Sequence, residues 1–368
     1  DFNHFGLIAP NEQRLELLGT VDFASFSAIK MDASVQAKNF QAMKVKENTE
    51  TMVYGKVFVD LSATLKGMLD NLKVRGNINL LDNSEVYYTL KSSPLELTDR
   101  SADVVRFVPC RVRDGPGYRR HGLSTRMGGV GTGGYATGNF AFLKGDDPDH
   151  VRENYRRMAK AIGVDEGRMV LSWQTHTTNI RRVTEDDAGK GITRERDYQD
   201  IDGLITDVPG MTLVTFYADC VPLYFLDPIH RAIGLSHSGR RGTVARMGRV
   251  TMEAMGREYG SKPEDIIACI GPSICQDCYE VGEEVAAEFR RAFSEEYWPE
   301  LLREKPNGKF LLNLWRANEI VLLEAGVKAD NIQITDICTH CNPDYLFSHR
   351  TMGNERGNLA AFLSIKES

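Results

Sequence analysis

Three side chains that can bind a metal stand at the ends of predicted β-strands. His176 ends the run MVLSWQTH, Cys220 ends MTLVTFYADC, and His237 ends RAIGLSH. If these are neighbouring strands of one sheet that end at the same edge, the two imidazoles and the thiol meet there. Two histidines and a cysteine are good zinc ligands, and three protein ligands leave a fourth position open, as in catalytic zinc sites. The alternative is that each is an ordinary strand-end or core residue.

The segment LSHSGRRGT, residues 235–243, joins the strand that ends at His237 to a predicted helix. The free N–H groups at a helix N-terminus favour an anion, and glycines let the backbone approach it closely. Arginine presents a fork of donors that matches phosphate. Arg240, Arg241 and Gly242 are therefore candidates for binding a phosphate beside a metal. The competing interpretation is an ordinary turn with solvated arginines.

A second unusual segment, HGLSTRMGGVGTGGYATGNF at residues 121–140, is rich in glycine and contains Arg126 and Asn139. It predicts a flexible loop over a pocket. The segment is not a phosphate-binding P-loop, because it lacks the Gly-Lys-Ser/Thr ending.

Two further cysteine pairs, CQDC and CTHC, lie late in the sequence. Two such pairs can form a four-thiolate zinc site, but their separation is much longer than in compact zinc ribbons. The sequence therefore favours buried free thiols and leaves the zinc site as the alternative. The four residues are Cys275, Cys278, Cys338 and Cys341.

Composition limits the classes of protein that this chain can belong to. Its 368 residues predict two domains, and its 42% hydrophobic content suffices for a sizeable core. No apolar run approaches the ~18 residues of a membrane span. A net charge of −6 argues against nucleic-acid binding. The odd number of cysteines, seven, and the lack of a leader-like start predict a reducing compartment, the cytoplasm.

The chain divides into two parts of different character. Residues 1–108 alternate apolar and polar positions over long spans, which is typical of successive β-strands, and show no catalytic constellation. Residues 109–368 alternate strands with helices and predict an α+β domain. Four helices are expected there, at 148–163, 240–260, 279–293 and 313–326.

The second part resembles the bacterial laccase-domain (YfiH-like) family over about residues 115–366. The resemblance rests on HGLSTRMGGVGTGGYATGNF, SWQTH, YADCVPLYFLDP, LSHSGRRGT, IGPSICQDCYEVGEEV, NLWRANEIVLLEAGV and CTHCNPDYLFSHR, in that order. It implies mixed β-sheets flanked by helices, and a zinc-dependent purine nucleoside phosphorylase with adenosine deaminase activity. Its substrates would be purine nucleosides and phosphate. The family's zinc ligands correspond to His176, Cys220 and His237.

The resemblance also assigns binding roles and shows departures. The family's loop arginine corresponds to Arg126, and its loop polar residue to Asn139. At the corner after the third ligand the family usually has Trp where this chain has Arg240, while Arg241 is kept. This departure leaves the ligands intact and bears on substrate preference. Cys275 stands where the family more often has Gly.

For phosphorolysis we expect phosphate to attack the anomeric carbon of the ribose while the purine leaves. Arg126 and Arg241 are the candidates for contacting the phosphate or the base. For deamination we expect a water activated by zinc to attack the purine carbon that bears the amino group. Asp219, next to Cys220, is the candidate proton carrier.

Copper-dependent oxidation of phenols is the alternative function. A conventional multicopper oxidase uses paired His-X-His motifs, and no two of the eight histidines here are separated by one residue. This excludes a conventional laccase, but Cu²⁺ in place of Zn²⁺ at the His/Cys/His site or at the four cysteines would permit weak oxidase activity. The sequence leaves the oligomeric state open.

Residues 50–108 resemble the C-terminal part of the TamB-like translocation and assembly proteins. The resemblance rests on VYGKVFVDLSATLKGMLDNLKVRGNINLL and SPLELTDRSADVVRFV. It implies that this β-rich segment is either a fusion partner or the product of read-through. A third, non-enzymatic hypothesis follows, in which the chain is an envelope-associated or structural zinc module.

Overall fold

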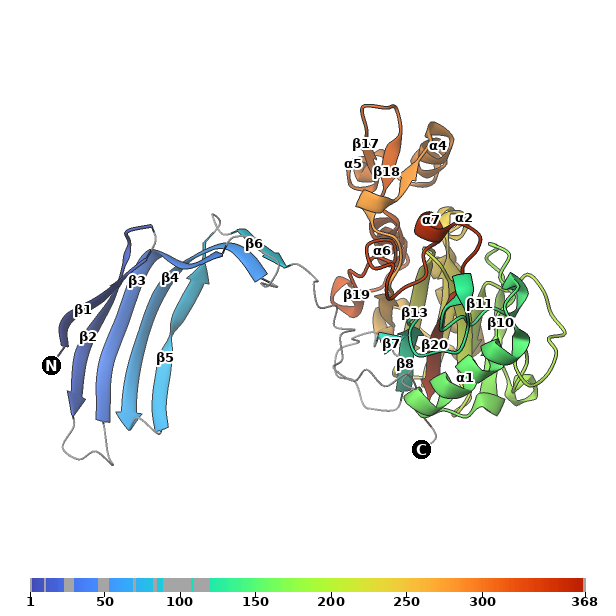
Figure 1. Cartoon of the computed structure of the whole chain (residues 1–368), viewed down its shortest axis with the longest axis horizontal. Helices are drawn as coiled ribbons and strands as arrows, with labels where there is room; N and C mark the ends of the chain where they lie inside the picture. Colours follow the sequence, from blue (N-terminus) through green and yellow to red (C-terminus); the bar gives the residue numbers. More distant parts are fainter. Residues whose placement is uncertain are drawn as a thin grey trace. The chain divides into compact units, whose positions relative to one another are not determined.

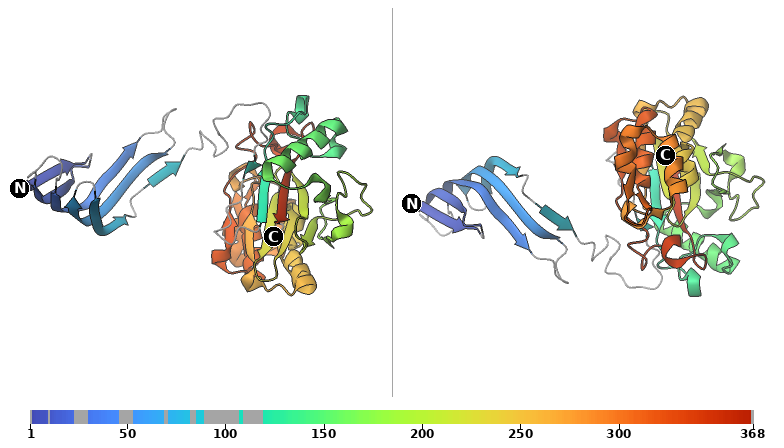
Figure 2. Two further views of the ribbon diagram at one scale, coloured as in Figure 1. Left: turned by 90° about the horizontal axis from the view of Figure 1, so that it is seen from below. Right: turned by 90° about the horizontal axis from the view of Figure 1, so that it is seen from above.

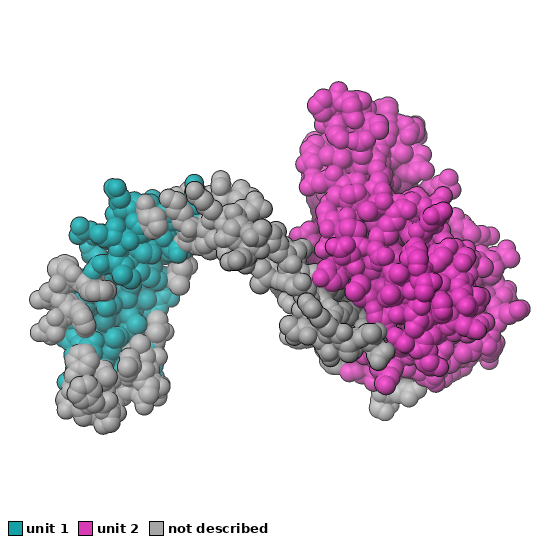
Figure 3. All heavy atoms as spheres, viewed as in Figure 1, with its two compact units in different colours: residues 1–97 teal, residues 98–368 magenta. Residues whose placement is uncertain are grey.

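The computed structural model describes residues 2–9, 11–22, 30–45, 53–68, 71–81, 85–88, 107–108 and 119–366. It divides into two compact units, Asp1–Leu97 and Thr98–Ser368 (Figure 3). The domain boundary expected between residues 108 and 109 borders a stretch outside the described residues, and it stays a prediction. Cys110 lies in that stretch. Among the described residues, no helix combines the length and the apolar character that a membrane crossing demands.

The first unit is an antiparallel sheet of long strands, as the alternating sequence predicts (Figure 1). Its order is β1-β2-β3-β4-β5, and β6 pairs with β4. Among its residues with described burial, only Ala9, Ala33, Ala37 and Gln41 are buried, so the sheet encloses little core. Its strands are β1 (Phe2–Ile8), β2 (Arg14–Asp22), β3 (Lys30–Val45), β4 (Val53–Met68), β5 (Asn71–Leu80) and β6 (Glu85–Tyr88).

The described residues of the second unit form three sheets. The largest has the strand order β10-β11-β14-β13-β15-β19, the second β7-β8-β20-β12-β9, and the smallest β16-β18-β17. The strands are β7 (Phe107–Val108), β8 (Arg119–Ser124), β9 (Met169–Leu171), β10 (Ile180–Arg182), β11 (Gly203–Thr206), β12 (Thr212–Tyr217), β13 (Val221–Asp227), β14 (Ala232–Ser238), β15 (Ile267–Ile270), β16 (Glu280–Val281), β17 (Leu302–Glu304), β18 (Phe310–Leu312), β19 (Ile332–Ile334) and β20 (Leu359–Ile365).

Helices flank the two larger sheets on opposite sides (Figure 2). The helices are α1 (Pro148–Ile162), α2 (Arg240–Val244), α3 (Met247–Tyr259), α4 (Glu283–Ala292), α5 (Trp298–Leu301), α6 (Leu314–Glu324) and α7 (His349–Met352). This arrangement confirms the expected mixed sheets with flanking helices.

Alternate side chains along a strand of the second unit pack into two different hydrophobic cores. On β13, Leu223 and Phe225 belong to the core that includes residues of α3 and α6. Tyr224 lies instead in the core between the two larger sheets, together with Ala361 of β20. Successive side chains of a strand point to opposite faces, so one apolar strand serves two cores. A third core joins α1 to β12 and β20, which makes four layers.

The helix ends follow the sequence in one case and depart from it in another. Asp147 caps α1 by accepting a hydrogen bond from the Asp149 backbone, and Gly163 ends it in the left-handed conformation, as expected. The prediction of a single helix at residues 240–260 is wrong. The segment forms two helices, α2 and α3, and the chain breaks between them at Arg246, which has a φ of 62°.

Tertiary contacts account for this break. The Arg246 guanidinium donates to Glu324 at 2.7 Å, and it lies over the Phe293 ring at 4.1 Å from the ring centre. These contacts come from α6 and from the residue that follows α4. They hold a backbone conformation that the local sequence does not favour.

A buried ion network supports the loop that follows β10. Asp187 is 2% exposed and accepts from Lys190 at 2.8 Å, from Arg181 at 2.6 Å and from the Thr184 backbone at 3.0 Å. Burial opposes ionisation of this carboxyl, but the hydrogen bonds from Lys190 and Arg181 outweigh it. The pKa of Asp187 is lowered to about 2.

We predict that Asp187→Asn lowers the free energy of unfolding at pH 7 by roughly 2–3 kcal/mol. Because the folded pKa lies below the unfolded value, this contribution is present above about pH 4 and is lost as the pH falls toward 2. Urea denaturation across that range measures both effects. Asp197→Asn is the control: Asp197 also accepts from Lys190, but its side chain is 65% exposed and screened by solvent, so its loss should cost much less than the loss of Asp187. Equal losses in the two variants would contradict the prediction.

Candidate metal and substrate site

The three predicted metal ligands converge in the second unit. Ligand atoms of His176, Cys220 and His237 all lie within 4.8 Å of one another. The two imidazole rings are 5.0 Å apart between centres and nearly perpendicular, at 79°. The structure therefore brings together the donor set that the sequence singled out.

The route by which these residues meet differs from the expected one. The expectation of neighbouring strands holds for two of them, because His176 and Cys220 follow β9 and β12, which are parallel neighbours in the five-stranded sheet. It is wrong for His237, because β14 belongs to the six-stranded sheet. Cys220 lies in the short link from β12 to β13, where the chain passes from one sheet to the other. His176 lies beyond the end of β9 with a φ of 67°, a strained conformation for a residue other than glycine. The site sits where the two sheets meet.

Asp202, which the sequence analysis missed, holds two of the three ligands. Its fully buried carboxylate accepts from His237 Nδ1 at 2.8 Å and from the His176 backbone at 3.0 Å. It also accepts from the backbone N–H groups of Thr175 and Thr177, each at 3.0 Å. The bond to Nδ1 leaves Nε2 of His237 for a metal. A carboxylate behind a ligating histidine is the usual outer partner in zinc sites.

The electrostatics of the cluster favour an ionised thiol. Burial raises the pKa of the Cys220 thiol, but His237 and His176 outweigh burial and lower it to about 6. Burial likewise opposes ionisation of Asp202, while the hydrogen bond and charge of His237 lower the pKa of that carboxyl. Thiolate, imidazole and a buried outer carboxylate are together the donor chemistry of a zinc site.

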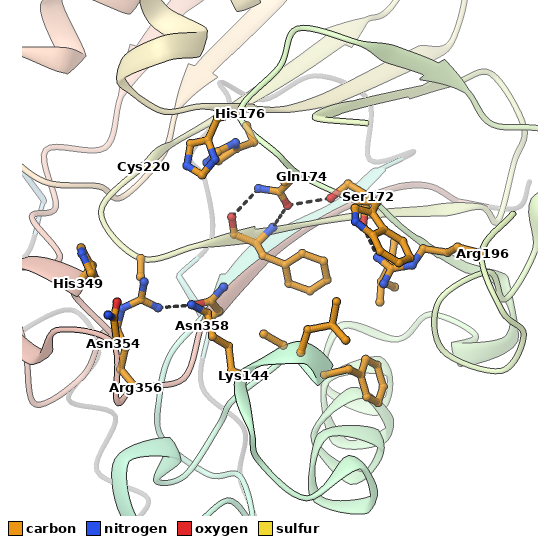
Figure 4. Close-up of a pocket in the computed structure, with 18 residues that line it drawn as sticks. Lys144, Ser172, Gln174, His176, Arg196, Cys220, His349, Asn354, Arg356 and Asn358 are labelled. Atoms are coloured by element: carbon orange, nitrogen blue, oxygen red, sulfur yellow. Dashed lines mark hydrogen bonds between the residues drawn. The ribbon is translucent and has the colours of Figure 1, made fainter. Parts of the chain in front are cut away.

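A cavity of about 430 Å³ opens beside the cluster (Figure 4). His176, Cys220 and His237 line it, and aromatic rings of Phe142, Trp173 and Phe216 form part of its wall. The volume falls within the range of small-molecule sites. Gln174 fixes the nearby main chain, because it both donates to and accepts from the backbone of Phe216.

The cavity is lined by cations and no carboxylate. Lys144, Arg196 and Arg356 line it, and no Asp or Glu is among its described lining residues. Arg356 is 7% exposed, and its Nε has no hydrogen-bond partner among the described residues. Burial lowers the pKa of Lys144, and the charge of Arg356 lowers it further. Two cations that repel each other within a carboxylate-free cavity favour a bound anion.

Arg126 and Asn139 lie outside the cavity lining. The Arg126 guanidinium donates to the main-chain oxygens of Ala136, at 3.0 Å, and Pro343, at 2.8 Å. Asn139 is fully buried, and its Oδ1 accepts from the Asn358 backbone at 2.9 Å. Arg126 therefore ties the glycine-rich loop to Pro343, and Asn139 ties it to the segment that carries Arg356.

Asp219 also supports the site from outside the cavity lining. Its carboxylate accepts from the Thr339 hydroxyl at 2.6 Å and from the Arg350 backbone at 2.7 Å. Its φ of 81° sets the turn that presents Cys220.

The two arginines after His237 do not line the cavity either. Arg240 donates to Glu288 of α4 at 2.7 Å, and Arg241 is exposed. Helix α2, whose start was expected to hold an anion, has only five residues. Gly242 is buried inside it, and a Cβ there would lie 3.3 Å from the His237 carbonyl oxygen.

Two cavity arginines were missed by the sequence analysis. Arg356 stands in GNERGN near the C-terminus, and its flanking glycines resemble those of the 235–243 corner, so the same reasoning applied there would have found it. Arg196, which stacks on Trp173 at 4.4 Å from the ring centre, carries no such signal.

Comparison with known proteins is consistent with this site. A family model described as multi-copper polyphenol oxidoreductase laccase matches residues 120–366, and a TamB C-terminal domain model matches residues 6–123. The chain belongs to the first of these families. The match to the second confirms the expected resemblance and extends it toward the N-terminus.

Proteins that are similar to this chain are named for two different enzymatic activities. A purine nucleoside phosphorylase from Bacteroides thetaiotaomicron is 35% identical, over 67% of this chain and 91% of that protein. An adenosine deaminase from an unknown prokaryotic organism is 35% identical, over 64% of this chain and 90% of that protein. The crystal structure of YlmD from Geobacillus stearothermophilus is 32% identical, covers 70% of this chain and 100% of that chain, and gives a TM-score of 0.65.

Gly239, which lies between His237 and α2, provides clearance for the cluster. A Cβ at this position would lie 2.8 Å from Cys220 Sγ and 3.4 Å from His176 Cδ2. We predict that Gly239→Ala displaces the thiolate and weakens zinc binding by about 10–100-fold while the protein stays folded. Competition with a chromophoric chelator measures the affinity. Gly256→Ala in α3 is the control, because its Cβ would meet only Ser261 O, at 3.2 Å. Unchanged affinity in Gly239→Ala would contradict the prediction.

Proposed function

We propose that residues 119–366 form a zinc-dependent purine nucleoside phosphorylase that also deaminates adenosine. The observation that carries the proposal is the carboxylate-free, cationic cavity that opens onto the His176, Cys220 and His237 cluster. The names of the similar phosphorylase and deaminase proteins support it.

Arg356 and Lys144 bind the phosphate in this proposal. The Arg356 guanidinium lines the cavity and is held in place by the donation of Nη1 to the Gly357 carbonyl oxygen at 3.0 Å, and Lys144 carries a second positive charge into the same cavity. Figure 4 places Arg356 and His349 on one side of the cavity and Arg196 on the other. Charge-assisted hydrogen bonds hold the phosphate oxygens and orient one of them toward the anomeric carbon of the ribose.

The aromatic part of the wall binds the purine. Phe142, Trp173 and Phe216 provide flat apolar surface for the base. In phosphorolysis a phosphate oxygen forms a bond to the anomeric carbon, and the bond between that carbon and the base nitrogen breaks. The base leaves with the electron pair of that bond. In deamination, water replaces the amino group of the base, and ammonia leaves.

His176, Cys220 and His237 would hold the zinc ion. They fit it because two imidazoles and an ionised thiol are zinc ligands, and because Asp202 orients one of the imidazoles. When bound, zinc supplies Lewis acidity to an oxygen placed against it. The protein's own contribution is to fix these ligands at the mouth of the cavity.

Arg126, Asn139 and Asp219 enter the proposal as positioning residues. Each is bonded to the main chain of the loops that carry the cavity wall, as described above. Arg240, Arg241 and Gly242 have no part in binding the substrate in this proposal, since none of them lines the cavity.

The activity test uses zinc-loaded protein with inosine or adenosine, with and without inorganic phosphate, and separates the products by chromatography. We expect the free base to appear from inosine only with phosphate, and inosine to appear from adenosine without it. Copper-dependent phenol oxidation is the competing function, which the description of the family favours. Copper-loaded protein that oxidises phenols, while zinc-loaded protein forms neither nucleoside product, would overturn the proposal.

Arg356→Gln tests the phosphate role directly. Loss of a charged hydrogen-bond partner worth about 1.5–3 kcal/mol should lower kcat/KM for phosphate by roughly 10–150-fold. Deamination of adenosine, which consumes no phosphate, should change much less. Arg240→Gln is the matched control, because its guanidinium pairs with Glu288 outside the cavity lining. Equal losses of phosphorolysis in the two variants would place the phosphate elsewhere.

A further inference from the structure

Four cysteine sulfurs form a second cluster, away from the cavity lining. All four sulfur atoms lie within 4.8 Å of one another. Cys278 Sγ and Cys341 Sγ are separated by 3.4 Å. The cluster consists of Cys275, Cys278, Cys338 and Cys341, all of them free thiols.

A tight turn aligns the first pair. The 3₁₀ helix η6 (Gln276–Cys278) begins directly after Cys275. The Cys278 backbone N–H donates to the Cys275 carbonyl oxygen at 3.2 Å. This turn closes on itself within three residues and keeps Cys275 and Cys278 close together. The C-x-x-C spacing therefore keeps both sulfurs in one cluster.

Backbone pairing brings the second pair to the first. Ser273 and Cys338 form a parallel bridge between two loops. The Ser273 N–H donates to Ile337 O at 3.1 Å, and the Thr339 N–H donates to Ser273 O at 3.2 Å. The long separation of the pairs in the sequence, which argued against a joint site, is thereby closed by tertiary structure.

Backbone donors fix the position of the Cys338 sulfur. It accepts from the backbone N–H groups of Cys275, at 3.3 Å, and Cys341, at 3.4 Å. Zinc–thiolate bonds of about 2.3 Å put the sulfurs of a tetrahedral site roughly 3.8 Å apart. The observed separations are compatible with this spacing after small rotations of the side chains.

We propose that a second, structural zinc ion is bound by four thiolates: Cys275, Cys278, Cys338 and Cys341. Four thiolates with C-x-x-C spacing are the ligand set of a closed structural zinc site, with no open position for a substrate. The ion ties the loop after β15 to the loop after β19. This inference goes beyond the proposed catalysis and does not depend on it.

The position of the cluster gives this zinc ion a role in the architecture. Thr339, the residue after Cys338, donates to the Asp219 carboxylate, and Asp219 precedes Cys220. Asp219 also accepts from the Arg350 backbone, at the start of α7. The four-cysteine site therefore anchors the segment that joins the cluster of His176, Cys220 and His237 to the C-terminal wall of the cavity.

The test measures zinc on the full chain with the other cluster disabled by His176→Ala and Cys220→Ser. We expect about one zinc ion per chain to remain, with a shell of sulfur ligands alone at about 2.3 Å in zinc-edge X-ray absorption. Adding Cys278→Ser and Cys341→Ser should remove that ion and lower the melting temperature. These readouts do not use catalysis, so failure of the proposed activity would leave them unaffected.

Three results would overturn the proposal. One is a folded His176→Ala/Cys220→Ser protein that retains no zinc. The second is a zinc shell that contains nitrogen or oxygen ligands. The third is disulfides among the four cysteines in the protein as purified, found by mass after alkylation without reduction. If the variant with both added serines does not fold, Cys341→Ser alone, at an exposed position, should still weaken zinc binding by tenfold or more.

Discussion

The buried carboxylate of Asp202 is the interaction on which the candidate site depends. A charged group in the interior is tolerated only when donors replace the lost water, and here they come from His237 and from three consecutive backbone N–H groups. The groups that donate to Asp202 belong to the segments that carry His176 and His237, so the same hydrogen bonds position both candidate ligands. The three N–H groups fix the loop that carries His176, and the imidazole bond fixes the tautomer of His237. One carboxylate thus holds His176 and His237, which come from two separate segments of the chain, next to each other.

This arrangement in turn depends on the register of the sheet. β11 and β14 pair antiparallel, with Gly203 opposite Ser236, and the His237 N–H donates to Asp202 O at 2.8 Å. A shift by one residue would turn the His237 side chain to the other face of the sheet. The third ligand, Cys220, comes from the link between the two larger sheets. The candidate metal site is therefore a consequence of how those sheets pack.

The polar residues of the candidate site fall into two groups: some line the cavity, and others support the loops that form its wall. Lys144 and Arg356 face the cavity, whereas Arg126, Asn139 and Asp219 are bonded to the loops behind it. Residues that position a loop are constrained as strongly as residues that touch a ligand. A motif that is prominent in the sequence therefore does not by itself mean contact with the substrate.

The three candidate metal ligands and most of the helices could be predicted from the sequence, because strand ends and helix caps are local signals. The caps of α1 at Asp147 and Gly163 are examples. The partner of His237 could not, since Asp202 lies far from it in the sequence and meets it only through the β11–β14 pairing. The break at Arg246 depends likewise on contacts with Glu324 and Phe293. The pairing of Arg240 with Glu288 could not be predicted either, because Glu288 comes from another helix.

The central claim is that the His/Cys/His cluster and the cationic cavity form one site for a metal and an anion. Crystals of this chain grown with zinc and inorganic phosphate test it most directly, with anomalous diffraction at the zinc edge. The account predicts a zinc ion held by His176, Cys220 and His237, and a phosphate within hydrogen-bond distance of Arg356. Phosphate bound at Arg240 and Arg241 instead, or no zinc among the three ligands, would contradict it.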